Sequence, residues 1–276
     1  MRISDDEIEV LRPDLPRGRF RSVLFDFDGT LSLIREGWPE VMIPMMVRVL
    51  RETGTSETDE ALTTVVEEFV MRLNGRQTIY QMIHLADEVR RRGKQPLEPL
   101  AYKHRYHELL MERIHGRLAD LQSGVAQPED WTVPGSHALL EALRSRGLTL
   151  YLASGTDLKY VRYEAALLGL APYFGEHIYG AVDDYQSFSK QMIIERILRE
   201  NGLQGDELLG FGDGFVEIEG VKQVGGVAVA VASDERTRAG INVWKRNRLV
   251  QAGADIVIPE YRKHQRLLEY LLPKNA

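Results

Sequence analysis

Cysteine is absent from this chain of 276 residues, which excludes several kinds of chemistry. A protein without thiols has no disulfide framework, no thiolate metal site and no cysteine nucleophile. Any catalytic group must therefore carry oxygen or nitrogen. Long apolar runs are missing as well, because no window approaches the roughly 18 apolar residues that a membrane-spanning helix requires.

The chain also lacks an excess of basic residues, since 35 Lys and Arg stand against 41 Asp and Glu, for a net charge of −6. This balance argues against a broad basic surface for nucleic acid. The first twenty residues contain acidic residues and prolines instead of the apolar stretch of a secretory signal. We therefore expect a cytoplasmic protein that binds neither nucleic acid nor membrane and acts on a small molecule. The sequence does not address its oligomeric state.

What the sequence does contain is a series of short apolar runs that end in small or acidic residues, which is typical of buried parallel strands. These runs cover residues 21–27, 149–153, 207–211, 227–232 and 255–259, with a weaker candidate at 177–181. Helical patterns lie between them, at residues 136–146, 158–168, 189–201 and 261–272. The alternation predicts an α/β fold with a Rossmann-like parallel sheet that is covered by helices on both faces.

Residues 37–128 have a different pattern, with helical periodicity and few strand signals. The predicted helices cover residues 39–52, 56–73, 78–92 and 97–115. The sequence therefore predicts an all-helical domain that is inserted into an α/β core formed by residues 1–36 and 129–276. Ligands of open α/β sheets bind beyond the carboxyl ends of the strands, and we expect the functional site there.

The first long strand ends in the sequence FDFDGT, which places two carboxylates two residues apart, at Asp26 and Asp28. A turn at Gly29 would let these carboxylates converge. Close carboxylates repel each other unless a cation lies between them, and oxygen ligands favour a hard cation such as Mg²⁺, which also binds phosphate oxygens. One carboxylate can then attack phosphorus while the other serves as acid and base. The alternative is an ordinary acidic turn after a buried strand.

The DFDGT sequence from Asp26 to Thr30 resembles the first motif of the haloacid dehalogenase-like (HAD) hydrolase superfamily, most of whose members are phosphatases. The superfamily pattern continues with a Ser or Thr after the second core strand, then a Lys, then an acidic pair. The matching residues occur in the required order, as Ser154, Lys190, Asp213 and Glu217. The resemblance extends over residues 20–259, and the helical insertion lies where a C1-type cap lies in phosphoglycolate phosphatases and β-phosphoglucomutases.

The resemblance implies a metal site built from the acidic residues. Asp26 would be both the nucleophile and a metal ligand, and Asp28 would be the acid and base with its backbone carbonyl on Mg²⁺. Asp213 would complete the metal site. Glu217 would contribute directly or through water, and it stands where many relatives have Asp.

The remaining matched residues are implied to bind the phosphoryl group. The Ser154 hydroxyl and the backbone N–H groups of Gly155 and Thr156 would hold a phosphate oxygen. Lys190 would neutralise the phosphate together with the Asp26 carboxylate. Gly155 stands where many relatives have Asn, so a side-chain donor is expected to be missing there.

The segment at residues 73–78 joins two of the predicted insertion helices and contains a cation and amides around a glycine. We expect Arg76 and Gln77 in this loop to contact the leaving group of the substrate, because their donors suit a polyhydroxylated or carboxylated molecule. The alternative is an ordinary polar turn. Lys245, Arg246 and Arg248 lie beyond the motifs, and we expect a surface role for them.

The function predicted from these residues is a Mg²⁺-dependent phosphatase that hydrolyses a small phosphorylated metabolite through an aspartyl-phosphate intermediate. A sugar phosphate or a phosphoglycolate-like acid is the expected substrate. The first alternative is a phosphomutase of the β-phosphoglucomutase kind, which would return the phosphoryl group to a reoriented sugar. The second is a non-catalytic phosphate-binding module on the same fold.

Overall fold

A computed structural model describes residues 8–182 and 184–273. Within these residues the chain forms a sheet of seven strands in the order β1-β7-β6-β5-β2-β3-β4. Neighbouring strands are parallel except for the edge strand β1, which is antiparallel to β7. The strands are β1 (Glu9–Val10), β2 (Ser22–Phe25), β3 (Thr149–Asp157), β4 (Ile178–Ala181), β5 (Leu208–Gly212), β6 (Val227–Val231) and β7 (Ile256–Ile258). The predicted α/β fold is thus confirmed.

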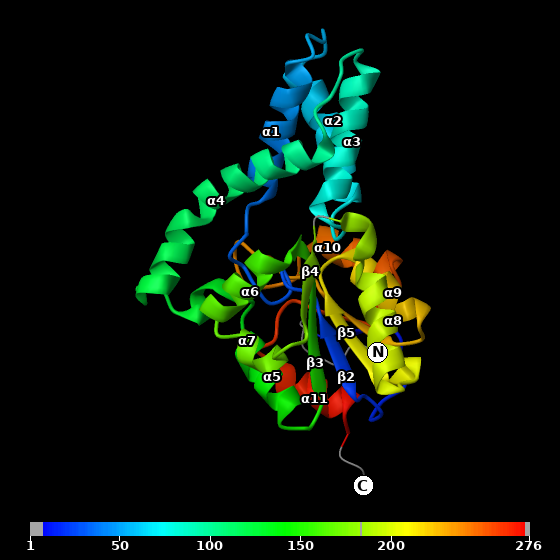
Figure 1. The fold of residues 1–276 in the computed structure, drawn as a ribbon. Coiled ribbons are helices and arrows are strands. Elements are labelled where there is room, and N and C mark those ends of the chain that lie inside the picture. Colours follow the sequence, from blue (N-terminus) through cyan, green and yellow to red (C-terminus); the bar gives the residue numbers. More distant parts are fainter. Residues whose placement is uncertain (1–7, 183, 274–276) are drawn as a thin grey trace.

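Both faces of the sheet are buried, which explains the nearly continuous apolar runs of its strands. Along β2, Val23 and Phe25 belong to one hydrophobic core, whereas Leu24 belongs to the other. The first core includes α5 (Ser136–Arg144), α6 (Leu158–Leu167), α7 (Ala171–Phe174) and α11 (His264–Leu271). The second includes α8 (Lys190–Asn201), α9 (Phe215–Gln223) and α10 (Val243–Gln251). Figure 1 shows these helices on either side of the strands.

Three short 3₁₀ segments lie in the connections of the core: η1 (Pro128–Trp131), η2 (Tyr185–Ser187) and η3 (Gly205–Glu207). Within the described residues, no helix is long and apolar enough to cross a membrane.

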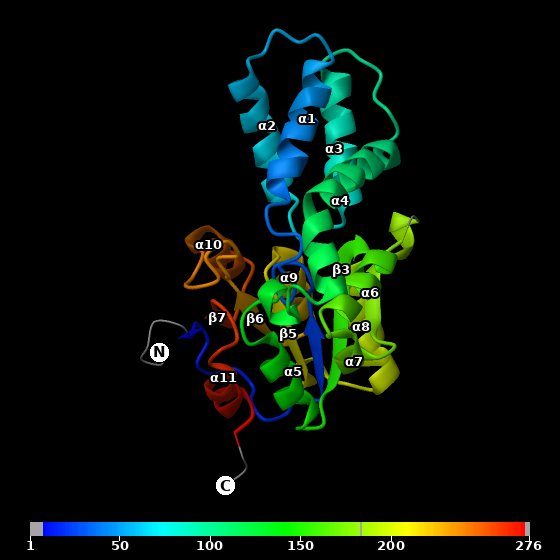
Figure 2. The same cartoon turned by 90° about the vertical axis from the view of Figure 1, so that its left-hand side faces the viewer.

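The chain between β2 and η1 forms a helical insertion, which we define as residues 39–123. It contains α1 (Pro39–Arg51), α2 (Asp59–Arg72), α3 (Thr78–Arg91) and α4 (Pro99–Ser123). Figures 1 and 2 show α1, α2 and α3 side by side beyond one end of the sheet, while α4 runs back to the core, where its first half contacts α6. The loop between α2 and α3 therefore faces the carboxyl ends of the strands.

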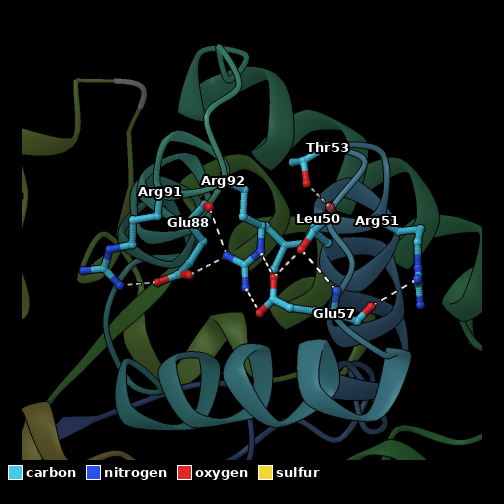
Figure 3. A network of polar contacts seen from close by, with 8 residues as sticks. Leu50, Arg51, Thr53, Glu57, Glu88, Arg91 and Arg92 are labelled. Carbon is cyan, nitrogen blue, oxygen red and sulfur yellow. Dashed lines mark hydrogen bonds and ion pairs between the residues drawn. The ribbon is translucent and has the colours of Figure 1, made fainter.

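The end of the insertion farthest from the sheet is held by Arg92, which follows α3. Its Nε and Nη2 donate to the two oxygens of Glu57 at 2.6 and 2.7 Å, and Nη1 donates to Glu88 at 2.7 Å (Figure 3). Bidentate contacts between a guanidinium and a carboxylate are among the stronger polar contacts in proteins. The α1–α2 connection is thereby tied to the C-terminal end of α3.

Two predicted boundaries were wrong. The helix expected to end at residue 115 continues to Ser123 in α4. Gly116 has a low helix propensity, but the burial of Leu118 and Leu121 continues the apolar face of the helix and offsets this cost. The strand expected to end at residue 153 continues to Asp157 in β3, past the register shift in its pairing with β4. The sequence reading also missed β1, α9 and α10, which are short.

Candidate active site

Most of the predicted site residues line a cavity of about 100 Å³ at the carboxyl ends of the central strands, whereas Gln77 and Glu217 lie outside its lining. We call it the main cavity. It lies between these strand ends and the α2–α3 loop of the insertion. Its lining includes Asp26, Asp28, Ser154, Gly155, Thr156, Lys190 and Asp213 from the core and Gly75, Arg76 and Thr78 from the insertion.

A tight turn shapes the loop after β2. The Asp26 N–H donates to the Phe211 carbonyl at 3.0 Å, which extends the pairing of β2 with β5 by one residue. The N–H groups of residues 30, 31 and 32 then all point to the Phe27 carbonyl. Gly29 has φ +75°, and a Cβ there would lie 2.3 Å from Asp213 Oδ2, so only glycine fits between the two acidic loops.

Asp26 is buried, and its Oδ1 accepts a hydrogen bond from Lys190 Nζ at 2.7 Å. Lys190 is the first residue of α8 and also contacts the carboxylate of Glu217. Burial raises the pKa of Asp26 to about 7, against the lowering effect of Lys190, and the nearby carboxylates of Asp213 and Asp28 raise it further. Burial and the two neighbouring carboxylates thus outweigh the effect of Lys190 on Asp26.

Asp28 is held by two hydroxyl groups from the end of β3. Its Oδ2 accepts hydrogen bonds from Thr156 Oγ1 at 2.8 Å and from Ser154 Oγ at 3.3 Å. The Thr156 N–H in turn donates to Ser154 Oγ at 3.0 Å, which fixes that hydroxyl. Burial raises the pKa of the Asp28 carboxyl, although Arg35 opposes the shift. Asp28 Oδ1 is shielded from solvent and has no hydrogen-bond partner among the described residues.

Asp213 follows β5 and is fixed from two sides. Its N–H donates to Thr30 Oγ1 at 2.9 Å, and its Oδ2 accepts from Lys245 Nζ at 2.7 Å. Lys245 also donates to Glu235 at 2.6 Å. Burial disfavours the charge of this lysine, but Asp213 and Glu235 outweigh it and raise the pKa of Lys245. The expectation of a surface role for Lys245 was wrong, because α10 brings its side chain into the acidic cluster.

Glu217 lies in the first turn of α9 and is almost fully buried. Its carboxylate contacts Lys190, so Lys190 lies between Glu217 and the nucleophile candidate Asp26. In the described part of the chain, no three side chains of the types His, Cys, Asp or Glu are grouped closely enough to hold a metal ion. The predicted role of Glu217 beside a metal stays a prediction, and the contact that the structure provides is the one with Lys190.

The α2–α3 loop packs directly on the core through its backbone. A Cβ on Gly155 would lie 3.1 Å from the Arg76 carbonyl oxygen, and a Cβ on Gly75 would lie 3.2 Å from Gly214 Cα. The absence of a side chain at Gly155 therefore leaves room for the insertion loop. This contact gives a physical reason for the glycine at a position where the resemblance led us to expect Asn.

The two loop residues predicted to contact substrate have different surroundings. Arg76 is exposed, lines the main cavity, and lies 5.9 Å from the ring centre of Tyr80. Gln77 is buried and does not line that cavity. Its side-chain amide donates to the carbonyls of Tyr185 at 3.1 Å and Phe188 at 2.7 Å. In this structure the Gln77 side chain connects the insertion to the core segment before α8 instead of reaching into the cavity.

Arg248 on α10 makes a second connection between the core and the insertion. Its guanidinium donates to the carbonyls of Met71, Arg72 and Asn74 at the C-terminal end of α2. The last carbonyls of a helix lack partners within the helix, so these hydrogen bonds satisfy them. The guanidinium also lies 4.7 Å from the ring centre of Phe215. The expected surface role of Arg248 is therefore wrong as well.

Sequence reasoning missed Arg35, which lines the main cavity close to Asp28. Its Nε lies 3.7 Å from Asp28 Oδ1, and Glu164 on α6 binds the guanidinium through Nε and Nη2. One signal for it was present, because Arg35 is the single charged residue within the apolar run LSLIR that follows the first motif. Nothing in the local sequence indicated Glu164 as its partner.

Comparison with known proteins agrees with this fold. The haloacid dehalogenase-like hydrolase family matches residues 20–225. A 5′-nucleotidase of Pseudomonas aeruginosa is 27% identical over 227 residues, which cover 80% of this chain and 88% of that protein.

Two solved structures share the fold at low identity. A predicted phosphoglycolate phosphatase from Haemophilus somnus superposes with a TM-score of 0.58 at 17% identity, covering 90% of this chain and 98% of its own. A β-phosphoglucomutase from Clostridium difficile also reaches 0.58, at 12% identity, with 91% and 97% covered.

The fold and the site thus define a parallel α/β protein with an acidic cavity and a helical insertion. The chain belongs to the haloacid dehalogenase-like hydrolase family, since the match covers most of its length. The predicted membership of this superfamily and the prediction of an enzyme are confirmed. Together, the family and the related 5′-nucleotidase support the hydrolysis of phosphoric monoesters.

Proposed function

We propose that this protein is a Mg²⁺-dependent phosphatase that hydrolyses a small phosphorylated metabolite through an aspartyl phosphate on Asp26. The observation that carries the proposal is the buried contact of Lys190 with Asp26, beside Asp28 and Asp213 in one cavity. A carboxylate held by a lysine at the carboxyl end of a central strand is placed to attack phosphorus.

In the first step, an Asp26 oxygen forms a bond to phosphorus while the bond from phosphorus to the leaving oxygen breaks. Asp28 donates its proton to that oxygen, and its raised pKa favours the protonated carboxyl that an acid requires. In the second step, the Asp28 carboxylate takes a proton from water, whose oxygen attacks the phosphorus of the aspartyl phosphate. Asp26 and inorganic phosphate are released, and Asp28 is protonated again.

Ser154, Thr156 and Lys190 stabilise the transferring group. The transition state of phosphoryl transfer spreads negative charge over the equatorial oxygens, so fixed donors and cations around it lower the barrier. Lys190 is held between Asp26 and Glu217, and the two hydroxyl groups are held against Asp28. Lys190 therefore needs little rearrangement when substrate binds, whereas each hydroxyl group must turn its single hydrogen from Asp28 to a phosphoryl oxygen.

The donor set of the cavity fits a hard divalent cation. Asp26 and Asp213 offer carboxylate oxygens, and the charge of Asp213 raises the pKa of Asp26, so a cation between the two carboxylates would relieve their repulsion. Asp26, Asp213 and the backbone carbonyl of Asp28 would hold the ion. Mg²⁺ bound there would neutralise the acidic cluster and supply positive charge to the phosphoryl oxygens.

The substrate is proposed to be small because the insertion loop packs on the core beside Gly155 and leaves a cavity of about 100 Å³. A sugar phosphate or a phosphoglycolate-like acid suits this size. The relative described as a 5′-nucleotidase adds nucleoside monophosphates to the candidates. We therefore propose a panel of these three classes, with release of inorganic phosphate as the measurement.

The test is phosphate release by the purified protein with Mg²⁺, with EDTA, and with Mg²⁺ restored after EDTA. We expect turnover of at least one phosphomonoester, loss of at least about 100-fold with EDTA, and recovery when Mg²⁺ is returned. Full activity in EDTA would contradict the metal proposal, and no turnover of any phosphomonoester would contradict the phosphatase proposal. A need for a bisphosphate activator would instead favour the phosphomutase.

A further inference from the structure

Lys245 lies between two carboxylates beside the main cavity, and no step of the proposed reaction uses it. Its Nζ donates to Asp213 Oδ2 at 2.7 Å and to Glu235 Oε1 at 2.6 Å. Both carboxylates belong to residues that line the main cavity. The side chains of Lys245 and Asp213 are only 9% and 12% exposed, so little water competes for these contacts. The lysine is therefore a fixed part of the acidic cluster.

The segment between β6 and α10 brings both partners to this point. The Asn242 N–H donates to the Ala232 carbonyl at 2.8 Å, so the two ends of the segment lie together. Ser233 Oγ donates to the Gly29 carbonyl at 3.0 Å, which ties the segment to the turn after β2. A Cβ on Gly29 would lie 3.1 Å from Glu235 Oε1. Glu235 is thus held against the turn that carries the proposed metal ligands.

The start of α10 is an unfavourable place for a buried lysine. Lys245 lies in the first turn of this helix, where its N–H donates to the side chain of the N-cap residue Asn242 at 3.0 Å. The N-terminal end of a helix carries partial positive charge, so a cation there is disfavoured. The burial of an ammonium group adds to this cost unless the group is paired. The two carboxylates offset both costs, which indicates that Lys245 serves the acidic cluster and not its own helix.

The contact with Lys245 divides the two oxygens of Asp213. Oδ2 accepts the hydrogen bond from Lys245, whereas Oδ1 lies 3.5 Å from Thr30 Oγ1, which is long for a hydrogen bond between oxygens. Oδ1 is therefore the oxygen of Asp213 that is left to bind a cation. Lys245 holds one oxygen of Glu235 in the same way.

The number of free carboxylate oxygens distinguishes the two common hard divalent cations. Mg²⁺ requires a small octahedral shell, uses one or two carboxylates and keeps several waters. Ca²⁺ takes roughly six to eight oxygens and often binds both oxygens of one carboxylate. A cluster in which a lysine holds one oxygen of each of two carboxylates suits Mg²⁺ better than Ca²⁺.

We propose that Lys245 and Glu235 form a positioning pair that selects Mg²⁺ over Ca²⁺ at the proposed metal site. Lys245 leaves Asp213 one oxygen for the ion and holds the carboxylate of Glu235 as well. This inference rests on the metal site of the proposed function and deepens it.

The test is calorimetric titration of the metal-free full chain with MgCl₂ and with CaCl₂, in the absence of substrate. The measured quantity is the Kd for Mg²⁺ divided by the Kd for Ca²⁺. Lys245→Met frees oxygens of both carboxylates, so we expect this ratio to rise at least about 10-fold, since the number and charge of the ligands set the affinity for Ca²⁺. Lys245→Arg keeps a cation with several N–H donors and should hold the ratio within about threefold of the wild type.

A second variant keeps the charge balanced, because the loss of one member of a buried ion pair can prevent folding. Lys245→Met with Glu235→Gln removes one cation and one anion and still frees Asp213 Oδ2. We expect the ratio to rise at least about threefold in this double variant. Arg246→Met removes the neighbouring cation of α10, which pairs with Glu9, and should leave the ratio unchanged. Circular dichroism and thermal melting check that each variant folds.

Three results would overturn the proposal. An unchanged ratio in the double variant would mean that Lys245 only closes its own segment. A rise in Lys245→Arg as large as in Lys245→Met would mean that the cation does not set the selectivity. Failure of the wild type to bind either ion would reject this inference together with the proposed metal. Hydrolysis is measured separately, by phosphate release, so a loss of the selectivity argument and a loss of the phosphatase proposal are distinguishable.

Discussion

The loops at the carboxyl ends of the strands and the helical insertion contribute to the same cavity through different kinds of contact. The strand loops place charged and hydroxyl side chains against one another, as in the contacts of Lys190 with Asp26 and of Thr156 with Asp28. The α2–α3 loop of the insertion contributes backbone groups, which approach Gly155 and accept hydrogen bonds from Arg248, and the neutral amide of Gln77. The placement of the catalytic groups and the closure of the cavity therefore depend on different contacts, so substitutions can test them one at a time.

The largest expected effect belongs to the strand loops. Asp26→Asn removes the proposed nucleophile and keeps the shape of the side chain, so kcat should fall by at least about 1,000-fold while the fold is retained. Phosphate release from p-nitrophenyl phosphate measures the effect. Asp206→Asn is the matched control, because Asp206 pairs with Arg19 on an exposed part of the core. Substantial residual activity of Asp26→Asn would disprove the assignment of the nucleophile.

A smaller effect is expected where the insertion touches the core. Gly155→Asn places a Cβ 3.1 Å from the Arg76 carbonyl oxygen, with an amide group beyond it, so the insertion loop must shift to make room. A displacement of about 1 Å in a catalytic site can lower the rate by about 100-fold, and we expect kcat/KM to fall by about 10- to 100-fold. Limited proteolysis should show faster cleavage at residues 73–78.

The matched control for this glycine is Gly116→Ala on α4. Gly116 lies inside a helix with open space around it, so alanine there should stabilise the protein by about 0.5–1 kcal/mol without lowering activity. Wild-type kcat/KM in Gly155→Asn would show that the close approach of the two backbones does not matter for closure of the cavity. It would contradict the idea that the insertion closes the cavity through this contact.

The smallest effect is expected for Arg248→Met, which removes the hydrogen bonds to the end of α2 and keeps an aliphatic side chain against Phe215. A hydrogen bond contributes about 0.5–1.5 kcal/mol, so KM should rise by about 3- to 10-fold while kcat changes less. Arg246→Met on the same helix serves as the control, because Arg246 pairs with Glu9. Equal kinetics for both variants would mean that Arg248 does not hold the insertion.

The same difference between the two regions explains what the sequence could predict. The strands, the Asp26 turn and the order of Ser154, Lys190 and Asp213 could be predicted because each depends on a few neighbouring residues. The family resemblance then connected these separate segments. That part of the site follows from local patterns and from the general rule that parallel strands deliver their loops to one edge of the sheet.

The contacts that could not be predicted join segments far apart in the chain. Arg35 pairs with Glu164, Lys245 with Asp213, and Gln77 with the carbonyl of Phe188. Nothing in the local sequence indicates which partner each of these residues has, because the pairs form only when the helices pack. Lysine and arginine on a short helix usually face solvent, which is why the surface role expected for residues 245 and 248 was wrong.

The position of β2 has a consequence for the synthesis of the chain. Ser22 in β2 pairs with Thr149 in β3 and with Leu208 in β5, so the central strand is made long before either of its neighbours. The helices of the insertion emerge in between, and their contacts are more local, which favours early folding. We therefore expect the apolar β2 segment to remain without its partner strands on the ribosome while the insertion folds. Aggregation of truncated nascent chains that end before residue 149 would be the sign of this exposure.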